Sequence, residues 1–372
     1  MRDLLLDRDA RDVDLVIAGD AGAYSRALAE RLGAKHRAHG RFGTAVLELP
    51  SGERIDVAAT RRETYSRSGA LPDVVEGARI EEDLARRDFT INAMAFELFP
   101  RRRLVDPHGG RADLAAGRIR FLHPRSPQDD PTRALRAVRY ANRLGFRIAP
   151  ESRLAIAAAI GRRAFRNVSG DRLRRELALL LSEERRGRAV ARLSSLRIDA
   201  AISPALVRPG ASRRLLAAEL LARRRRPEPG WLCYLFAWMG DARIGSLGRL
   251  ADRLDFSGRD RARLLSWPRA RRLLGVGFAE RPLSQRSRRA EGLESEERIA
   301  AAALASPRDR RAILAIAPPV ELTISGTDLL KAGVAAGPRI GIALARTRAA
   351  REDGRIGPEE ELAFALRAAR RR

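Results

Sequence analysis

The sequence predicts an α+β unit at the N-terminus followed by domains built only from helices. Residues 13–98 mix short apolar strands with helical segments, whereas helical periodicity dominates after Arg103. The chain has 372 residues, a length typical of two to four compact units. Hydrophobic residues make up 45% of it and aromatic residues only 5%, which indicates a globular protein rich in helix formers.

Local patterns justify the N-terminal elements in order. VDLVIAG at 13–19 alternates as a strand does, and AYSRALAERLG at 23–33 has the period of a helix that ends near Gly33. TAVLELPSGERIDVAATR at 44–61 predicts two strands joined by a Pro-Ser-Gly turn. Beyond Arg103 we expect no strand. Four segments there predict helices: RADLAAGRIRFL at 111–122, DDPTRALRAVRYANRLGF at 129–146, PESRLAIAAAIGRRAF at 150–165 and SGDRLRRELALLL at 169–181.

The charge of the chain predicts a polyanionic partner. Its formal net charge is +26, from 73 Lys and Arg against 47 Asp and Glu. Genome composition also produces a preference for arginine over lysine, but an excess of positive charge attracts phosphate backbones. The single cysteine, Cys233, excludes an intramolecular disulfide and a cysteine-rich zinc site. Because no apolar run approaches the length of a membrane helix, we expect a cytoplasmic protein without membrane association.

Two carboxylates, Asp12 and Asp14, stand two residues apart at the start of the first strand. Alternate strand residues face the same side, so both would project together while Val13 points into the core. Such an oxygen-rich pair suits Mg²⁺ and the two-metal chemistry of nucleotidyl transfer. The same three residues also fit a solvated strand edge or a turn.

Two further segments strengthen the interpretation as a phosphate-handling site. RIDVAATRRE at 54–63 puts Asp56 on a second strand, where it would lie beside the first pair or at the surface. EEDLARRDFTINAMAF at 81–96 holds two adjacent arginines, an aspartate and Asn92 ahead of an apolar segment. A guanidinium group binds phosphate oxygens in a bidentate manner, as a triphosphate requires.

Five segments in order resemble the successive motifs of the class II tRNA nucleotidyltransferase and bacterial poly(A) polymerase family. They are RDLLLDRDARDVDLVI at 2–17, EEDLARRDFTINAMAF at 81–96, VDPHGGRADLAAGRIRFL at 105–122, QDDPTRALRAVRYANRLGF at 128–146 and SGDRLRREL at 169–177. Residues 322–365 also resemble the tail of many such enzymes. The middle, about 185–315, shows no close match.

The resemblance implies a polymerase-β-like nucleotidyltransferase head with a mixed sheet, followed by all-α neck, body and tail domains. We expect the head at 1–100, the neck at 101–182, the body at 183–290 and the tail at 291–372. In the family the Asp-x-Asp carboxylates hold Mg²⁺, which assigns the metal to Asp12 and Asp14. The position of Asp56 on the second strand makes it our candidate for a third catalytic carboxylate. Arg2 would bind the triphosphate and Arg87 the nucleotide. Arg86 and Asp88 fit a structural role equally well.

The resemblance also implies how the nucleotide is read. Asp130 and Arg133 of DDPTR match the family's base-reading element, and a carboxylate with a guanidinium group imitates a Watson–Crick partner for cytosine or adenine. Arg136 and Arg139 follow at three-residue steps and would hold base and phosphates. An alternative for Asp130 is the N-cap of the helix, since Pro131 follows it.

Two other segments predict mechanical roles. In DPHGGRADLAAGRIR, Gly109 and Gly110 would form a turn held by Asp106 and Asp113. In SGDRLRREL, Ser169 would cap a helix whose Asp171, Arg172 and Glu176 tie the neck helices together.

We expect an enzyme that adds C, A or both to the 3′ end of tRNA, with tRNA, CTP and ATP as partners and Mg²⁺ as cofactor. A poly(A) polymerase and enzymes that add only C or only A remain alternatives, and the oligomeric state is open.

The arginine clusters at 223–226 and 269–272 would contact tRNA phosphates or form a solvated face. Family members have a strand and a Gly-Gly or Gly-Ser turn before the segment that here begins with Met1. We therefore expect a longer natural protein, or alternatively an RNA-binding protein with an inactive head.

Overall fold

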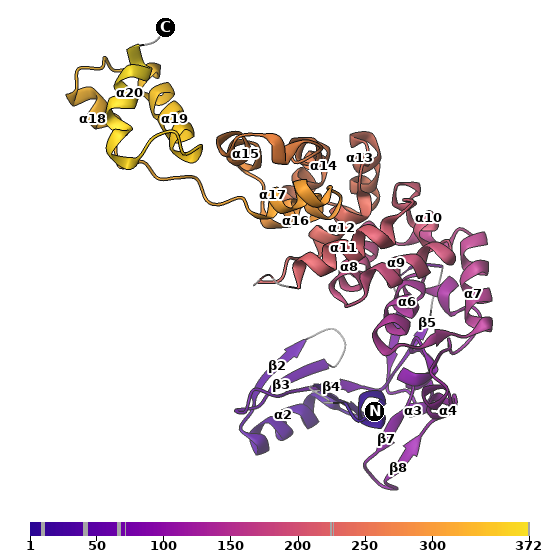
Figure 1. Cartoon of the computed structure of the whole chain (residues 1–372). Coiled ribbons are helices and arrows are strands. Elements are labelled where there is room, and N and C mark those ends of the chain that lie inside the picture. Colours follow the sequence, from indigo (N-terminus) through magenta and orange to yellow (C-terminus); the bar gives the residue numbers. More distant parts are fainter. Residues whose placement is uncertain are drawn as a thin grey trace. The chain divides into compact units, whose positions relative to one another are not determined.

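The computed structural model describes residues 1–8, 12–39, 44–64, 68–70, 72–223, 225 and 227–370, without the side chains of Asp12 and His39. It divides into two compact units. Unit 1 comprises Met1–Val207 with Arg253–Asp255, and unit 2 comprises Arg208–Asp252 with Phe256–Arg372. Figure 1 traces the elements of both along the chain.

Unit 1 contains the described strands and the first ten α-helices. Its strands are β1 Asp12–Ile17, β2 Lys35–His39, β3 Thr44–Glu48, β4 Arg54–Ala59, β5 Arg61–Thr64, β6 Asp73–Glu76, β7 Ala95–Glu97, β8 Arg103–Val105, β9 Arg118–Ile119 and β10 Arg147–Ile148. Its helices are α1 Arg2–Leu5, α2 Ala21–Leu32, α3 Ile80–Ala85, α4 Gly110–Ala115, α5 Ser126–Asp129, α6 Thr132–Leu144, α7 Pro150–Gly161, α8 Gly170–Ser182, α9 Arg186–Ser195 and α10 Ile198–Ile202, with 3₁₀ turns η1 Thr90–Asn92, η2 Ala164–Asn167 and η3 Pro204–Leu206.

The main sheet has the order β1-β4-β3-β2 and is mixed, because β1 is parallel to β4 while the other neighbours are antiparallel. Helix α2 covers one face of it (Figure 1). The core on that face contains Leu47, Val57 and residues of α2, with Leu15 and Ile17 packed against it. The opposite residues of β1 and β4, including Asp14 and Asp56, therefore face away from α2. Helix α2 ends at Gly33, which has a left-handed φ of 60°, as predicted.

The predicted fold class, an α+β N-terminal part followed by helices, is confirmed. Three details differ. Val13 lies on the core-facing side but is 46% exposed, so it does not point into the core as predicted. Short strands β8, β9 and β10 occur after residue 102, where no strand was expected, because runs of two or three residues carry no periodic signal. The segment 111–122 is helical only as far as Ala115 and then bends through Gly117 into β9.

The described regular elements of unit 2 are all helices. Its elements are α11 Ala211–Ala222, α12 Trp231–Met239, α13 Ile244–Arg253, α14 Gly258–Leu273, η4 Phe278–Glu280, α15 Leu283–Ala290, α16 Ser295–Ala303, α17 Pro307–Leu314, α18 Gly326–Lys331, α19 Pro338–Glu352, η5 Pro358–Glu360 and α20 Glu361–Arg370. Helix α12 is central: Phe236 stacks on Trp267 of α14 at 5.1 Å, and both side chains are fully buried. Among the described helices of the chain, none is long and apolar enough to cross a membrane.

Candidate active site of unit 1

Two of the three predicted carboxylates are brought together on the sheet. In the parallel pairing of β1 with β4, Asp14 lies opposite Asp56 and Asp12 lies opposite Arg54. Adjacent strands are about 4.8 Å apart, so the Asp14 and Asp56 side chains project side by side from the face that α2 leaves open. Asp14 is exposed, whereas the Oδ1 atom of Asp56 accepts from Arg54 Nη2 at 2.7 Å. The Asp12 side chain lies outside the described part of the structure.

The donor set of these strands fits a hard cation. Asp14 has no hydrogen-bond or ion-pair partner within the described part of the chain, so its carboxylate is available to a ligand. Asp56 is already half-buried and oriented by Arg54. Oxygen ligands from one or two carboxylates are what Mg²⁺ uses beside substrate phosphates. The described side chains include no group of three or more His, Cys, Asp or Glu residues placed to hold a metal.

The Arg86-Arg87-Asp88 segment follows α3, and its three side chains make different contacts. Arg86 pairs with Asp83 at 2.8 Å and with Glu63 at 3.2 Å, which fastens α3 to β5. Arg87 makes only longer contacts, at 3.5 Å to Asp83 and 3.4 Å to the Asn92 carbonyl, and its buried Nε has no hydrogen-bond acceptor. Of the two arginines in this segment, Arg87 therefore has N–H donors available to a ligand.

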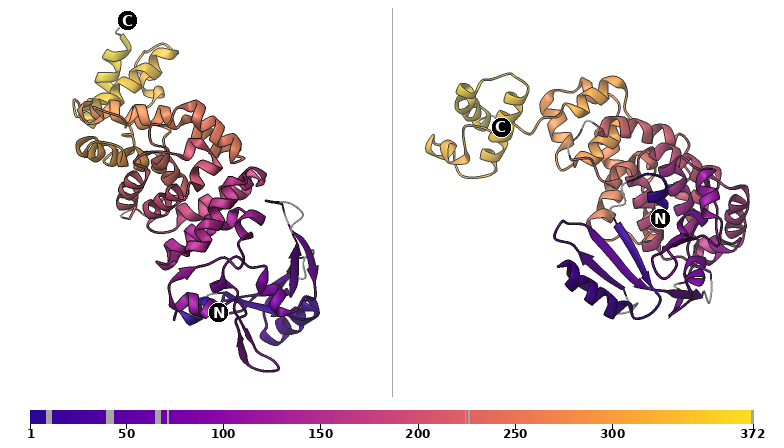
Figure 2. Two further views of the ribbon diagram at one scale, coloured as in Figure 1. Left: turned by 90° about the vertical axis from the view of Figure 1, so that its right-hand side faces the viewer. Right: turned by 90° about the horizontal axis from the view of Figure 1, so that it is seen from below.

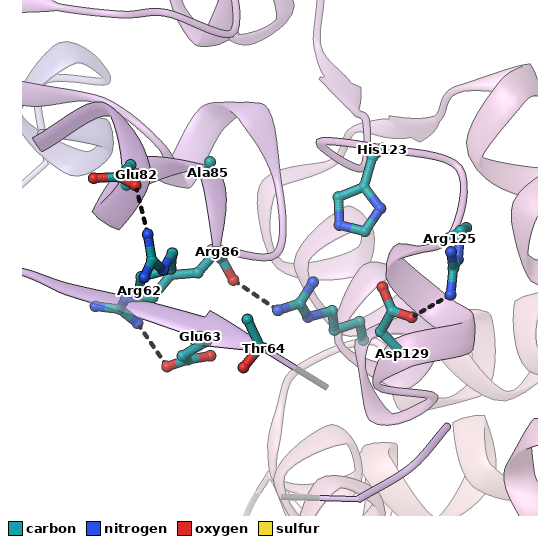
Figure 3. Close-up of a pocket in the computed structure, with 10 residues that line it drawn as sticks. Arg62, Glu63, Thr64, Glu82, Ala85, Arg86, His123, Arg125 and Asp129 are labelled. Carbon is teal, nitrogen blue, oxygen red and sulfur yellow. Dashed lines mark hydrogen bonds and ion pairs between the residues drawn. The ribbon is translucent and has the colours of Figure 1, made fainter. Parts of the chain in front are cut away.

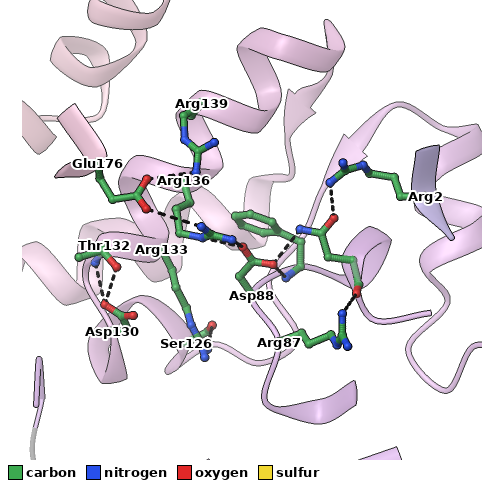
Figure 4. Close-up of polar contacts among 12 residues, drawn as sticks. Arg2, Arg87, Asp88, Ser126, Asp130, Thr132, Arg133, Arg136, Arg139 and Glu176 are labelled. Atoms are coloured by element: carbon green, nitrogen blue, oxygen red, sulfur yellow. Dashed lines mark hydrogen bonds and ion pairs between the residues drawn. The ribbon is translucent and has the colours of Figure 1, made fainter. Parts of the chain in front are cut away.

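Asp88 is the hub of a buried hydrogen-bond network (Figure 4). It is 8% exposed, and its Oδ1 atom accepts from the Phe89 amide at 2.9 Å and from Asn92 Nδ2 at 2.8 Å. Its Oδ2 atom accepts from Arg136 Nε at 2.8 Å. Asn92 in turn accepts from Arg2 Nη1 through Oδ1 at 2.7 Å. One carboxylate and one amide thus link α1, the Arg86-Arg87-Asp88 segment and α6.

The predicted arginines of α6 are held by protein carboxylates. Arg136 contacts Glu176 of α8 at 3.5 Å as well as Asp88, and Arg139, which is 5% exposed, contacts Glu176 at 3.2 Å. Burial alone would lower the pKa of Arg136, but Asp88, Tyr140 and Glu176 raise it above its ordinary value. These contacts fasten α6 to α8, the mechanical role predicted for Glu176.

Tyr140 lies among four guanidinium groups. The Cζ atoms of Arg2, Arg136, Arg139 and Arg143 are 4.9, 5.6, 5.2 and 5.7 Å from its ring centroid. Each distance is within cation–π range. The opposite side of the cluster is packed by Phe89, whose ring meets that of Tyr140 edge-on at 5.6 Å. The ring therefore fixes Arg2 relative to α6.

Asp130 and Arg133, the predicted base-reading pair, both begin α6 but have different surroundings. Arg133 is buried, donating through Nη1 to Ser126 Oγ at 2.7 Å and through Nη2 to the Arg86 carbonyl at 2.6 Å. Asp130 Oδ1 accepts from the Thr132 amide at 3.1 Å and pairs with Arg172 of α8 at 2.8 Å. The amide contact has the geometry of the capping role that was the alternative for Asp130.

A cavity of about 530 Å³ lies beside Arg133 (Figure 3). One wall carries Glu63 and Arg86, and the other carries His123 and Asp129. Burial lowers the pKa of His123 below its ordinary value, against the opposing effect of Asp129. The cavity thus joins α3, β5 and the start of α6 around polar side chains.

The predicted mechanical contacts are present except at Asp171. Among the described residues its carboxylate pairs with Arg174 and Arg175 of its own helix, at 2.7 and 2.8 Å, and not with another neck helix. Asp106 accepts from the Gly110 and Arg111 amides at 2.6 and 2.9 Å, and Asp113 accepts from Thr90 Oγ1 at 2.7 Å. Gly109 has a left-handed φ of 72°. Ser169 caps α8 by accepting from the Arg172 amide at 3.4 Å.

The two arginine clusters of unit 2 remain a prediction. Arg224 and Arg226 lie outside the described residues. Arg271 pairs with Asp241 at 3.2 Å, whereas Arg269 and Arg272 are exposed.

Sequence reasoning missed Asn92 and Tyr140 as parts of the site. Asn92 was noted beside the arginines, but only the folded chain shows that its amide joins Arg2 to Asp88. For Tyr140 a signal was available: an aromatic residue flanked on one helix by Arg136, Arg139 and Arg143 predicts cation–π contacts at helical spacing.

Comparison with known proteins gives one family match and several curated relatives. The family described as Poly A polymerase head domain matches residues 1–120. The A-adding tRNA nucleotidyltransferase of Geobacter sulfurreducens is 40% identical over 56% of this chain and 24% of its own length. That of Halalkalibacterium halodurans is 44% identical over 49% of this chain and 44% of its own, and the CC-adding enzyme of Deinococcus radiodurans is 38% identical over 51% and 50%. The matched stretch thus spans half or less of these relatives.

Solved structures match over nearly the whole chain. A structure titled CCA-adding enzyme apo form I is 30% identical, with a TM-score of 0.79, over 97% of this chain and 86% of its own. The Thermotoga maritima CCA-adding enzyme complexed with tRNA is 28% identical, with a TM-score of 0.79, over 98% and 88%.

Proposed function

Because the chain belongs to the class II tRNA nucleotidyltransferase and bacterial poly(A) polymerase family, we propose that it adds C, A or both to the 3′ end of tRNA from CTP and ATP, releasing pyrophosphate. The observation that carries the proposal is the side-by-side placement of Asp14 and Asp56 on the open face of the sheet. Oxygen-lined strands of this kind suit phosphoryl chemistry without a covalent enzyme intermediate.

Asp12, Asp14 and Asp56 would hold Mg²⁺ in this proposal. When bound, the metal activates the RNA 3′ hydroxyl and steadies the pyrophosphate leaving group. The chain supplies the orientation: strand pairing fixes Asp14 against Asp56, and Arg54 keeps one Asp56 oxygen turned toward itself. The other Asp56 oxygen and the Asp14 carboxylate then remain for the cation.

Arg2 and Arg87 would bind the triphosphate. The Arg87 Nε has no acceptor of its own. Its ion pair with Asp83 and its hydrogen bond to the Asn92 carbonyl are both long, so phosphate oxygens can replace them at small cost. Arg2 is held from two sides, by Asn92 and by the Tyr140 ring, which fixes its guanidinium group before a nucleotide arrives.

Asp130 and Arg133 would read the base, with Arg136 and Arg139 supporting them from the same helix. One oxygen of Asp130 already accepts from Thr132 and Arg172, which leaves its second oxygen for an exocyclic amine. Arg133 would have to exchange its contacts with Ser126 and the Arg86 carbonyl for acceptors on the base. Base reading thus requires the Arg133 guanidinium group to leave these two contacts.

The remaining assignments complete the proposal. The head would comprise 1–100, the neck 101–182, the body 183–290 and the tail 291–372, with neck, body and tail holding the tRNA acceptor arm. Cys233, the single cysteine of the sequence, is buried, which suits the reducing cytoplasm in which we expect the enzyme to act.

A 3′-extension assay tests the function. tRNA transcripts lacking their last one, two or three nucleotides are incubated with Mg²⁺ and CTP, ATP or both, and the products are resolved to single nucleotides. We expect incorporation that Asp14→Ala abolishes, because it removes a metal ligand. Glu30→Ala, an exposed carboxylate on α2, serves as the matched control that keeps activity.

The positions at which extension stops distinguish the possible products. Stopping after two cytidines, after one adenosine, or after the complete triplet separates CC-adding, A-adding and CCA-adding enzymes, and a long adenosine tract identifies a poly(A) polymerase. tRNA binding without incorporation, the same for the chain and for Asp14→Ala, would contradict the proposal.

A further inference from the structure

The hairpin tip, residues 98–102 between β7 and β8, exposes large apolar side chains. Leu98 is 65% and Phe99 is 88% exposed. Figures 1 and 2 show the hairpin projecting from the rest of unit 1, with the tip at its free end. Phe96, on the adjacent strand, is another 46% exposed. A run of exposed apolar residues on one protruding turn marks an interaction surface more strongly than scattered single residues do.

The hairpin tip is also positively charged. Arg101 and Arg102 are exposed and have no ion-pair or hydrogen-bond partner in the described part of the chain. Arg103 is neutralised by Glu97 of the opposite strand at 2.7 Å. Arg102 adopts a left-handed φ of 44°, a conformation that glycine would adopt at lower cost. An arginine at that position therefore adds positive charge but makes the local backbone conformation less favourable.

We propose that the hairpin tip is an RNA contact that binds an unpaired nucleotide. Arg101 and Arg102 would hold the phosphates on either side, and the exposed ring of Phe99 would stack on the base. Arginine forks match phosphate geometry, and base stacking on an aromatic side chain is the common way in which proteins hold single-stranded RNA. The hairpin shares no side chain with the carboxylates or with the network around Asp88.

The size and charge of the tip favour RNA over its two rivals. An anionic membrane would take up the same residues, but stable membrane anchoring takes more than one such signal, and the hairpin tip is a single small patch. An acidic protein would satisfy Arg101 and Arg102, but an exposed ring next to two unpaired arginines matches more closely the alternation of base and phosphate along a single strand. A nucleotide uses both kinds of group.

Photo-crosslinking tests the contact directly. A single-stranded RNA of about ten nucleotides containing 4-thiouridine is irradiated with the full chain, and the crosslinked peptides are identified by mass spectrometry. We expect a crosslink within residues 96–103. Phe99→Ala should reduce its yield about tenfold, and the double variant Arg101→Glu, Arg102→Glu should lower the salt dependence of RNA affinity by about 1.4 in the log–log slope, since each phosphate contact contributes about 0.7.

The double variant Arg26→Glu, Arg31→Glu is the matched control, because it reverses two exposed arginines of α2, outside the hairpin tip and outside the parts proposed to hold tRNA. Circular dichroism verifies that all variants fold. Crosslinks only outside 96–103, or an equal loss of affinity in the control, would overturn the proposal. Binding to phosphatidylserine vesicles that depends on Phe99, with RNA crosslinking unchanged, would assign the tip to membranes instead. Nucleotide incorporation is measured separately, so failure of the proposed function leaves this result interpretable.

Discussion

Replacing Asp88 by alanine tests whether a single carboxylate holds the Arg86-Arg87-Asp88 segment against α6. Asp88 accepts from the Phe89 amide, Asn92 Nδ2 and two nitrogens of Arg136, and it is 8% exposed. After the change, Arg136 keeps Glu176, at 3.5 Å, as its one carboxylate partner among the described residues, and the Asn92 amide loses its acceptor.

The expected cost follows from these contacts. Removing one partner of a buried ion pair costs about 3–5 kcal/mol. The Arg136 side chain is 32% exposed, so water recovers part of this loss, and we expect about 3 kcal/mol. Asp88→Asn retains two acceptor contacts and should cost about half as much. In a double-mutant cycle, Asp88 and Arg136 should couple by about 2 kcal/mol.

The tryptophans dictate the choice of assay. Trp231, Trp238 and Trp267 all belong to unit 2, so tryptophan fluorescence reports only on that unit. Amide hydrogen exchange of peptides covering 86–97 and 132–144 reports on unit 1. We expect their exchange to accelerate about a hundredfold in Asp88→Ala, equivalent to the 3 kcal/mol above. Tryptophan fluorescence should stay unchanged.

Two results would refute the reasoning. Acceleration by less than about threefold in both peptides would mean that other contacts hold the segment. A coupling near zero between Asp88→Ala and Arg136→Ala would mean that each side chain acts through different neighbours.

Three further changes have defined outcomes. Gly110→Ala would place a Cβ atom 2.2 Å from the Thr90 carbonyl oxygen, so unit 1 should lose about 3 kcal/mol by amide exchange, and an unchanged value would contradict that close approach. Burial lowers the pKa of His123, so its contribution to stability is full above pH 6.5 and is lost as pH falls from there toward its lower folded-state pKa. The Tm of the unchanged chain should therefore fall between pH 7.5 and 5.5, and His123→Gln should make that fall smaller. Glu361→Ala removes the carboxylate that pairs with Arg351 at 2.7 Å, so limited proteolysis should cut the α19–α20 region about tenfold faster, and an unchanged rate would show that the pair is dispensable.

The sequence predicted those elements whose pattern is long and local. Strand β1, helix α2, the β3–β4 hairpin and helix α6 each carry a clear period, and all are present. Strand β2, with the sequence KHRAH, escaped because an edge strand with charged side chains has no apolar alternation. Val13 has the correct alternation, yet it remains exposed because the core against α2 begins further along β1, at Leu15.

In the candidate site, too, the features that follow from local patterns were predicted and those that depend on distant residues were not. The pairing of Asp14 with Asp56 follows from two strand assignments, once β1 and β4 are known to be neighbours. The contact of Arg2 with Asn92 joins residues 90 positions apart at 2.7 Å, and that of Phe89 with Tyr140 joins residues about fifty positions apart at 5.6 Å. No local pattern encodes such pairs. The sequence predicted two alternative roles for Asp130, base reading and helix capping. The capping contact occupies only one of its two carboxylate oxygens.

The charge balance around Tyr140 indicates which arginines are free to meet a triphosphate. The cluster contains Arg2, Arg136, Arg139 and Arg143, and four carboxylates contact these same side chains, namely Asp3, Asp88, Glu176 and Glu183. Four charges of each sign cancel, so the three arginines of α6 act mainly as a scaffold, whereas Arg2 would have to exchange its contact with Asp3 for a phosphate oxygen. Arg87 is outside this balance, because Asp83, its one carboxylate partner in the described part of the chain, is shared with Arg86 and lies 3.5 Å from Arg87. Of the two adjacent arginines, the second is therefore the one suited to a phosphate, as its position in the motif implied.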